Sequence, residues 1–135
     1  MKKLFIFLFI IKSIFASENY ELNLYEKILP VIFKKDILKV YVDEDAQEII
    51  KNSKIFIVVK NCHKASLLIG SGFNFIHKEC LKKPLFATDY KSFITNENSF
   101  GAFYWRKSRP QIKFKSNVLF KYHLTLPNSL IKFTK

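Results

Sequence analysis

The fold is decided by the segment Leu38-Lys39-Val40-Tyr41-Val42-Asp43-Glu44-Asp45 and by the apolar run at residues 55–59 that follows it. Residues 38–42 alternate in polarity and contain β-branched valines, which predicts a strand. Asp43 is followed by two acidic residues, Glu44 and Asp45, which is typical of the capped start of a helix. We therefore expect a helix over residues 46–52. The run 55–59 is apolar throughout, as in a strand buried on both faces. This order predicts an α/β unit with a parallel sheet.

The segments on either side of residues 38–59 continue the alternation of helix and strand. Residues 20–33 have apolar side chains at helical spacing, and Pro30 is expected to end that helix early or kink it. The later elements expected are a strand at 66–70, one or two helical turns at 74–82, a strand at 84–88 and a short helix at 90–94 capped by Asp89.

The C-terminal third predicts a β-hairpin. Residues 101–105 and 111–115 are aromatic or alternating, and they flank the polar turn Lys107-Ser108-Arg109-Pro110. Two short helical segments, residues 117–122 and 128–133, close the chain. The expected fold is a single α/β domain: a mostly parallel sheet flanked by helices on both faces, with an antiparallel C-terminal hairpin.

The first sixteen residues have the pattern of a secretory signal peptide. Met1-Lys2-Lys3 is a short positive segment, residues 4–11 are apolar without a break, and Ala16 is a small residue at the cleavage position. We therefore expect a signal peptide over residues 1–16, a mature domain over 17–135 and a periplasmic location. Lys12 interrupts the apolar segment, and a retained N-terminal anchor is the alternative.

The chain is strongly basic. Three lysines leave with the signal, so the net charge falls from +12 to +9. Such a charge ordinarily indicates nucleic acid or anionic surfaces, but an exported protein rarely meets nucleic acid, and we expect no such partner. The excess of lysine, with many Ile, Phe and Asn, is also what an AT-rich coding sequence produces. A weak attraction to anionic membrane surfaces is the functional alternative.

Cys62 and Cys80 are the only cysteines. In an oxidising compartment two cysteines are more often paired than free, so a Cys62–Cys80 disulfide is expected; two separate buried thiols are the alternative. The chain-entropy estimate for a loop of this length is about 3 kcal/mol of stabilisation. Neither cysteine belongs to a CxxC motif, which argues against a thiol-exchange role.

The sequence contains no motif for catalysis or cofactor binding. It has neither a phosphate-binding glycine loop nor a nucleophile elbow, so we expect no enzymatic activity, no cofactor and no metal. The nominal zinc set Cys62, His63, His77 and Cys80 lacks the usual ligand spacing, and adjacent residues of a strand point in different directions.

Two carboxylates follow predicted strands. Asp43 and Asp89 would approach one another, near Gly70, at the carboxyl edge of the sheet, where ligands bind in open α/β folds. The simpler interpretation is that both cap helices.

The hairpin contains an unusual cluster, Tyr104, Trp105, Arg106 and Arg109, which holds both arginines and the only tryptophan of the chain. Along a strand, Phe103 and Trp105 share one face and Tyr104 and Arg106 share the other. Trp, Tyr and Arg are enriched at binding hot spots. We therefore interpret Tyr104, Arg106 and Arg109 as the rim of a partner or anionic-ligand site that Trp105 anchors or buttresses. The alternative is that the aromatic residues fill the core and the arginines solvate a turn.

Three segments together resemble the YfiR-like family of periplasmic regulators. They are Tyr25–Phe33, which is placed like the opening helix of that family; Asn61–Ile69, in which Cys-His precedes an apolar run; and the block from Pro84 through the hairpin to Phe114. Residues 126–132 are similar to the final leucine-rich helix of the family. The aromatic-Trp-Pro that follows the family's first helix is replaced here by Phe33-Lys34-Lys35, and the hairpin is more aromatic and basic.

The resemblance implies a periplasmic, non-enzymatic regulatory module. Such a domain docks on the extracytoplasmic part of a membrane signalling protein, a diguanylate cyclase or a sensor kinase. Two other functions stay open from the residues alone. One is a periplasmic small-molecule binding protein that uses the crevice near Asp43, Gly70 and Asp89; the other is a small hydrolase without a recognisable signature.

Overall fold

A six-stranded sheet forms the centre of the molecule in the order β2-β1-β3-β4-β5-β6. The computed structural model describes residues 20–71, 73 and 78–135, and the expected signal peptide lies outside them. The strands are β1 Leu38–Val42, β2 Phe56–Val58, β3 Leu67–Ile69, β4 Leu85–Ala87, β5 Ser99–Arg106 and β6 Arg109–Phe114. The first five pair in parallel and β6 pairs antiparallel to β5, which confirms the expected α/β fold.

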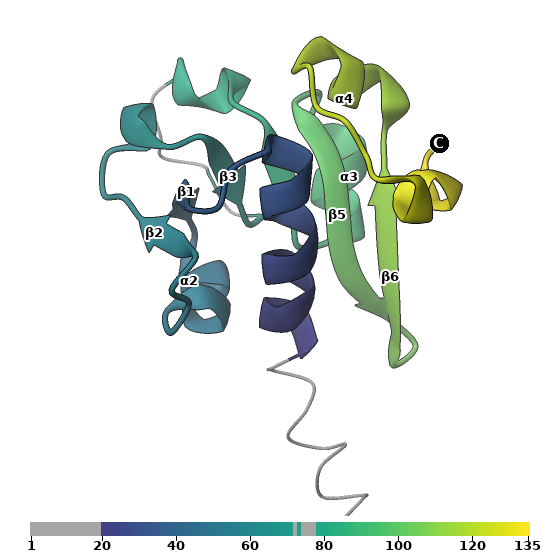
Figure 1. Cartoon of the computed structure of the whole chain (residues 1–135), viewed down its shortest axis with the longest axis horizontal. Helices are drawn as coiled ribbons and strands as arrows, with labels where there is room; N and C mark the ends of the chain where they lie inside the picture. Colours follow the sequence, from purple (N-terminus) through teal and green to yellow (C-terminus); the bar gives the residue numbers. More distant parts are fainter. Residues whose placement is uncertain (1–19, 72, 74–77) are drawn as a thin grey trace, which may run out of the picture.

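Helices cover both faces of this sheet (Figure 1). Residues 20–33 are helical and lie across one face together with α2, Glu44–Ile50; α3, Tyr90–Thr95, lies on the other face. The chain closes with α4, Ser116–Lys121, and the 3-10 helix η3, Asn128–Phe133, which lies beside β6. Two further 3-10 turns are η1, Cys62–Lys64, and η2, Cys80–Lys82. Of the turns expected at 74–82, residues 74–77 lie outside the described part.

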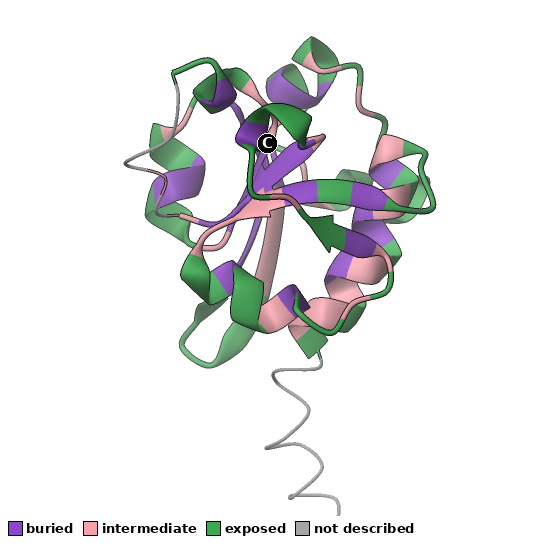
Figure 2. Ribbon diagram, turned by 90° about the vertical axis from the view of Figure 1, so that its left-hand side faces the viewer, coloured by how far each residue is buried: buried purple, intermediate pink, exposed green. Residues whose placement is uncertain are grey.

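The sheet separates a large apolar core from a small one. The helix of residues 20–33, α2 and α4 pack on the large core, in which Tyr25, Leu29 and Phe86 are at most 1% exposed. The small core, on the α3 face, consists of Ala87, Phe93, Ala102 and Tyr104. Figure 2 shows that buried and exposed residues succeed one another along the α-helices, as expected where an α-helix packs one face on a core.

Both predicted aspartate caps are confirmed. The Asp43 carboxylate accepts the Ala46 amide at 2.9 Å to cap α2, and the Asp89 carboxylate accepts the Ser92 amide at 2.7 Å to cap α3. Asp43 also accepts the Ser71 amide at 2.8 Å, which ties the end of β1 to the end of β3. These two ends form the switch point of the doubly wound order.

The glycine beside that switch point has no room for a side chain. Gly70 has φ +146°, and a Cβ there would lie 2.5 Å from the Asp43 carboxylate. The carboxylate therefore occupies the space next to Gly70, where it accepts the backbone amides of Ala46 and Ser71. This arrangement supports the capping interpretation of Asp43.

Of the two effects predicted for Pro30, an early end or a kink, the early end is wrong, because residues 20–33 are helical throughout. The last turn is held by tertiary packing: Ile32 is 1% exposed, and the Phe33 ring meets the Phe100 ring edge-on at 5.6 Å. That burial outweighs the single backbone bond that proline removes.

The prediction that the run 55–59 is buried on both faces is also wrong. β2 is an edge strand, and Ile57 and Val58 are 46% and 38% exposed. A short apolar run cannot distinguish an edge strand from a central one, because that position depends on the topology.

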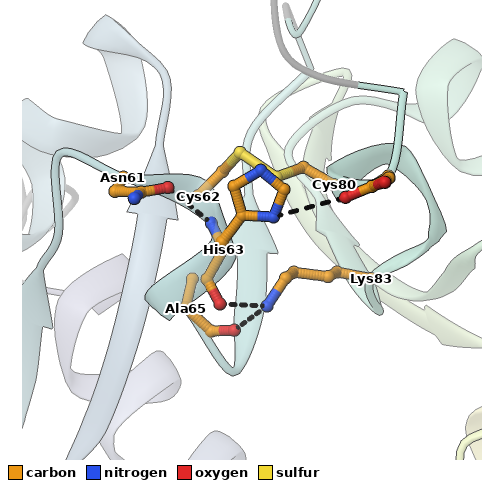
Figure 3. Close-up of a disulfide and its surroundings, with 7 residues drawn as sticks. Asn61, Cys62, His63, Ala65, Cys80 and Lys83 are labelled. Atoms are coloured by element: carbon orange, nitrogen blue, oxygen red, sulfur yellow. Dashed lines mark hydrogen bonds and ion pairs between the residues drawn. A yellow bond between two sulfur atoms is a disulfide. The ribbon is translucent and has the colours of Figure 1, made fainter.

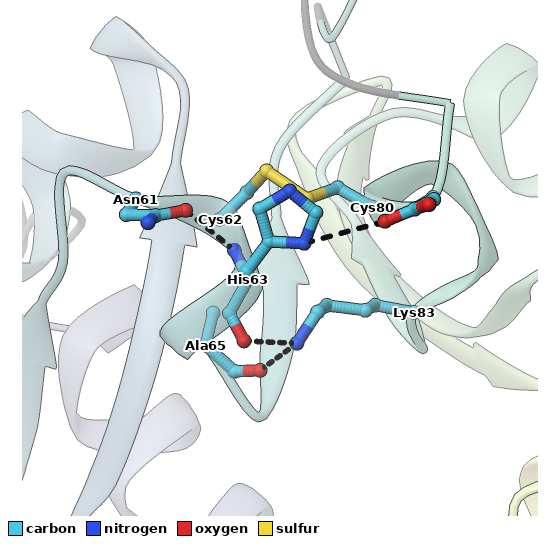
Figure 4. A network of polar contacts seen from close by, with 7 residues as sticks. Asn61, Cys62, His63, Ala65, Cys80 and Lys83 are labelled. Atoms are coloured by element: carbon cyan, nitrogen blue, oxygen red, sulfur yellow. Dashed lines mark hydrogen bonds and ion pairs between the residues drawn. A yellow bond between two sulfur atoms is a disulfide. The ribbon is translucent and has the colours of Figure 1, made fainter.

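The Cys62–Cys80 disulfide is present and joins η1 to η2 (Figure 3). Beside it, the Lys83 ammonium donates to the carbonyls of His63 at 3.0 Å and Ala65 at 2.5 Å, and the Asn61 side chain accepts the His63 amide (Figure 4). The cystine and the lysine together hold the β2–β3 connection against the segment before β4.

Among the described residues, no helix is both long and apolar enough to cross a membrane.

Candidate interaction site

The β5–β6 hairpin positions all four candidate residues, Tyr104, Trp105, Arg106 and Arg109. Its turn consists of Lys107 and Ser108, whose φ angles are 50° and 64°. Arg109 and Pro110 were predicted to lie in the turn, and this is wrong, because both belong to β6. Two consecutive positive φ values identify a type I′ turn, whose twist matches that of the strands. The turn therefore places Arg106 directly opposite Arg109.

Tyr104 does not lie on the rim of a surface site. It is 7% exposed and packs in the small core, with its ring 5.5 Å from the Tyr90 ring. Its hydroxyl is buried and has no hydrogen-bond partner within the described part of the chain. Burial, and secondarily Tyr90, raise the pKa of Tyr104 above its ordinary value, while Arg106 acts in the opposite direction.

Trp105 points to the opposite face and buttresses the helix of residues 20–33. Its indole Nε1 donates to Glu21 Oε1 at 2.6 Å, and its ring contacts those of Phe103 and Tyr20 at 5.6 and 6.1 Å. The ring is still 42% exposed. The predicted division of faces between Trp105 and Tyr104 is thus seen, and the structure separates the two aromatic residues.

Arg106 and Arg109 stay at the surface beside the turn. Both are exposed, and with Lys107 and Gln111 they line an open depression of about 430 Å³. No carboxylate forms an ion pair with either guanidinium among the described residues. Like charges directly opposite each other in a sheet are destabilising, so this pair creates a concentrated positive site that has no counterion within the described chain.

A second, larger groove lies along the edge of β6, beside the N-terminal helix. It has a volume of about 450 Å³ between that helix, the hairpin and η3. Its lining residues are Tyr20, Leu24, Phe103, Pro110, Gln111, Ile112, Lys113, Leu130, Lys132, Phe133, Thr134 and Lys135. The hairpin sequence alone could not indicate this groove, because its walls come from both ends of the chain. The mixed apolar and basic sequence of residues 130–135 was the available signal.

The alternative site near Asp89 has its polar groups already engaged. A hollow of about 410 Å³ beside α3 includes Asp89, Ser92, Asn96 and Asn98. The Ser92 hydroxyl donates to the Ser71 carbonyl at 3.3 Å, and the Asn96 and Asn98 amides donate to backbone carbonyls at 3.0 and 2.6 Å. These side chains hold loops in place.

Three residues of the nominal zinc set, Cys62, His63 and Cys80, lie close together. One ligand atom each from Cys62, His63 and Cys80 lies within 4.8 Å of the others. The strand assumed for Cys62 and His63 is wrong, because both lie in η1, and the 3-10 turn brings the imidazole close to the sulfurs. His77 lies outside the described residues. In this oxidised form the two sulfurs are bonded to each other.

No protein-family model matches this chain, and no curated protein matches it either.

Proposed function

We propose that this chain is an exported, non-catalytic regulatory module that docks on the extracytoplasmic part of a membrane signalling protein. The observation that carries the proposal is the Arg106–Arg109 pair, which stands exposed at the turn of the hairpin without an ion-pair partner among the described residues. Guanidinium groups bind carboxylates and phosphates in bidentate geometry. A partner with acidic side chains would relieve the repulsion between the two arginines.

Two further features support an extracytoplasmic location. The Cys62–Cys80 disulfide is of the kind that persists in oxidising compartments. Residues 1–16 have the pattern of a secretory signal. If the proposal is correct, protein recovered from the periplasm has the intact mass of residues 17–135.

The YfiR-like resemblance supplies the class of partner. The order of a leading helix, a cysteine-led segment and a C-terminal hairpin is similar to that of periplasmic regulators of diguanylate cyclases. We propose a membrane-anchored cyclase or sensor kinase as the protein that this chain regulates.

The experiment is capture of the partner from solubilised membranes with the exported chain as bait. Arg106→Ala with Arg109→Ala should weaken capture by about 1–4 kcal/mol in binding free energy, the usual hot-spot range. The matched control is Lys60→Ala with Lys64→Ala, which removes the same charge from exposed positions remote in sequence from the hairpin. Both double variants should keep their thermal midpoint, because exposed substitutions stay within about 0.5 kcal/mol. Equal capture by both variants, or loss of stability without loss of capture, would refute the proposal.

A further inference from the structure

The outer strand of the hairpin has an open backbone edge. β6 is the last strand of the sheet. The Lys115 amide donates to the Phe100 carbonyl at 3.0 Å, and in an antiparallel ladder every second pair exchanges such bonds. Counting along the register from this pair, the backbone groups of Pro110, Ile112 and Phe114 point away from β5.

The C-terminal segment covers only one end of that edge. The Lys135 amide donates to the Phe114 carbonyl at 2.9 Å, where Thr134 forms a parallel bridge with Phe114. Within the described chain, the carbonyls of Pro110 and Ile112 and the amide of Ile112 stay open along the groove of about 450 Å³. Open backbone groups of this kind are the ones with which an added strand pairs.

The two sides of the open edge differ in chemistry. On the face of the N-terminal helix, Ile112 lies opposite Phe103, and Leu130 and Phe133 line the same groove. On the α3 face, Lys113 lies opposite Ala102, and its ammonium lies 5.9 Å from the centre of the Tyr90 ring.

Two more cations share the α3 side of the edge. The Lys135 ammonium also lies over Tyr90, at 5.7 Å. Arg109 precedes Lys113 on the same face of β6. A strand added here would therefore have one face against apolar side chains and the other against cations.

We infer that β6 accepts an extended segment of the partner in which apolar and acidic side chains alternate. The inference rests on the proposed function and names the chemistry of the docked segment. Apolar side chains would enter the groove beside Ile112 and Phe133, and acidic ones would meet Arg109, Lys113 and Lys135. A second copy of β6 does not fit, because it would bring Arg109 and Lys113 of both copies together. Pro110 and Lys113 are the kinds of residue that prevent such self-pairing at a sheet edge.

The direct test uses a capped eight-residue peptide that alternates valine and glutamate, labelled for fluorescence anisotropy, with the oxidised exported chain. The comparison peptides are four valines followed by four glutamates, and an alternating valine–lysine peptide. The alternating acidic peptide should bind roughly tenfold or more tightly than either comparison peptide, because only it satisfies both faces at once. Hydrogen exchange at the Ile112 amide should slow on binding.

Two variants test whether the peptide binds at the edge of β6. Ile112→Pro removes the outward amide but no bond to β5, and should lower affinity roughly tenfold, whereas Ile112→Val should not. If the proline variant fails to fold, the charge swap Arg109→Glu with Lys113→Glu keeps the test decisive, because it should transfer preference to the valine–lysine peptide. Equal binding of the alternating and block peptides, an unprotected Ile112 amide, no transfer of preference, or dimers formed through β6 would overturn the inference.

The two proposals fail in different ways. If no membrane protein is captured by the exported chain, the proposed function fails, whatever the peptides show. If a membrane protein is captured and Arg106→Ala with Arg109→Ala weakens that capture, but the alternating and block peptides bind equally well, the regulatory function stands and the strand-pairing inference fails.

Discussion

The Tyr104 hydroxyl is the residue-scale feature that departs most from ordinary packing. It is buried without a hydrogen-bond partner in the described part of the chain, and burial raises its pKa. An unpaired buried hydroxyl costs about 1–3 kcal/mol of desolvation.

We therefore expect Tyr104→Phe to leave stability unchanged or to raise it by about 1 kcal/mol, since the ring contact with Tyr90 and the packing in the small core are kept. Urea unfolding of the two proteins would measure the difference. A loss of more than about 1 kcal/mol would mean that the hydroxyl has a bound water or ligand in solution.

Tyr25 is a buried tyrosine whose ionisation should destabilise the fold at alkaline pH. It is 1% exposed, and burial, followed by the charges of Glu21 and Asp43, raises its pKa well above the ordinary 10.0. The folded state thus holds this proton more tightly than the unfolded chain does. Its contribution is complete below pH 10 and is lost as the pH rises further.

The free energy of unfolding should fall above pH 10 by up to about 1.4 kcal/mol per pH unit for this group. Tyr25→Phe should remove the contribution of this one ionising group from the slope of unfolding free energy against pH. Chemical denaturation between pH 8 and pH 11 tests this; identical slopes for the two proteins would show that Tyr25 does not control the alkaline loss.

At the scale of elements, the hairpin combines a stable register with an unfavourable turn. Lys107 and Ser108 both adopt positive φ, whereas type I′ turns strongly prefer Asn-Gly. Lys107→Asn with Ser108→Gly should raise stability by about 1 kcal/mol and leave the opposition of Arg106 and Arg109 intact. Thermal unfolding of the double variant provides the measurement. A lower midpoint would mean that the lysine side chain contributes more to the hairpin than its backbone conformation costs.

The elements predicted best are those specified by local chemistry. The strand Leu38–Val42 is observed with the bounds that its alternation predicts, and Asp43 and Asp89 cap their helices as expected. η3 covers the residues expected to be helical, 128–133, although as a 3-10 helix. The helix does not end at Pro30 as one alternative predicted, because the burial of Ile32 and the partial burial of Phe33 outweigh the local propensity of proline.

The candidate site was predictable only in part, because its decisive contacts are remote in sequence. The two faces of β5 follow from strand geometry, and the exposure of Arg106 and Arg109 matches their expected place on the surface. The partner of the Trp105 indole, Glu21, is 84 residues away. No pattern within the hairpin identifies that contact or places Leu130 in the same groove as Ile112.

At the scale of the whole molecule, stability depends on a cross-link through the short connections. The disulfide closes a separation of 18 residues between η1 and η2. Reduction, or Cys62→Ser with Cys80→Ser, should lower the free energy of unfolding by about 3 kcal/mol. Urea unfolding with and without a thiol reductant would measure this. Two labelled thiols in denatured, unreduced protein from the periplasm would contradict it.

The exposed arginine pair and the open edge of β6 lie at the same end of the sheet. Arg106 and Arg109 flank the turn, and the edge of β6 continues from it along the groove toward η3. We therefore propose that this hairpin is the surface by which the chain contacts a membrane protein.

The most direct measurement is photo-crosslinking in living cells with a benzophenone side chain in place of Gln111, which lines both the arginine depression and the groove. The control carries the same group in place of the exposed Lys60. We expect an adduct with an integral membrane protein from position 111 and none from position 60. Adducts of equal yield from both positions, or an adduct from position 60 alone, would contradict it.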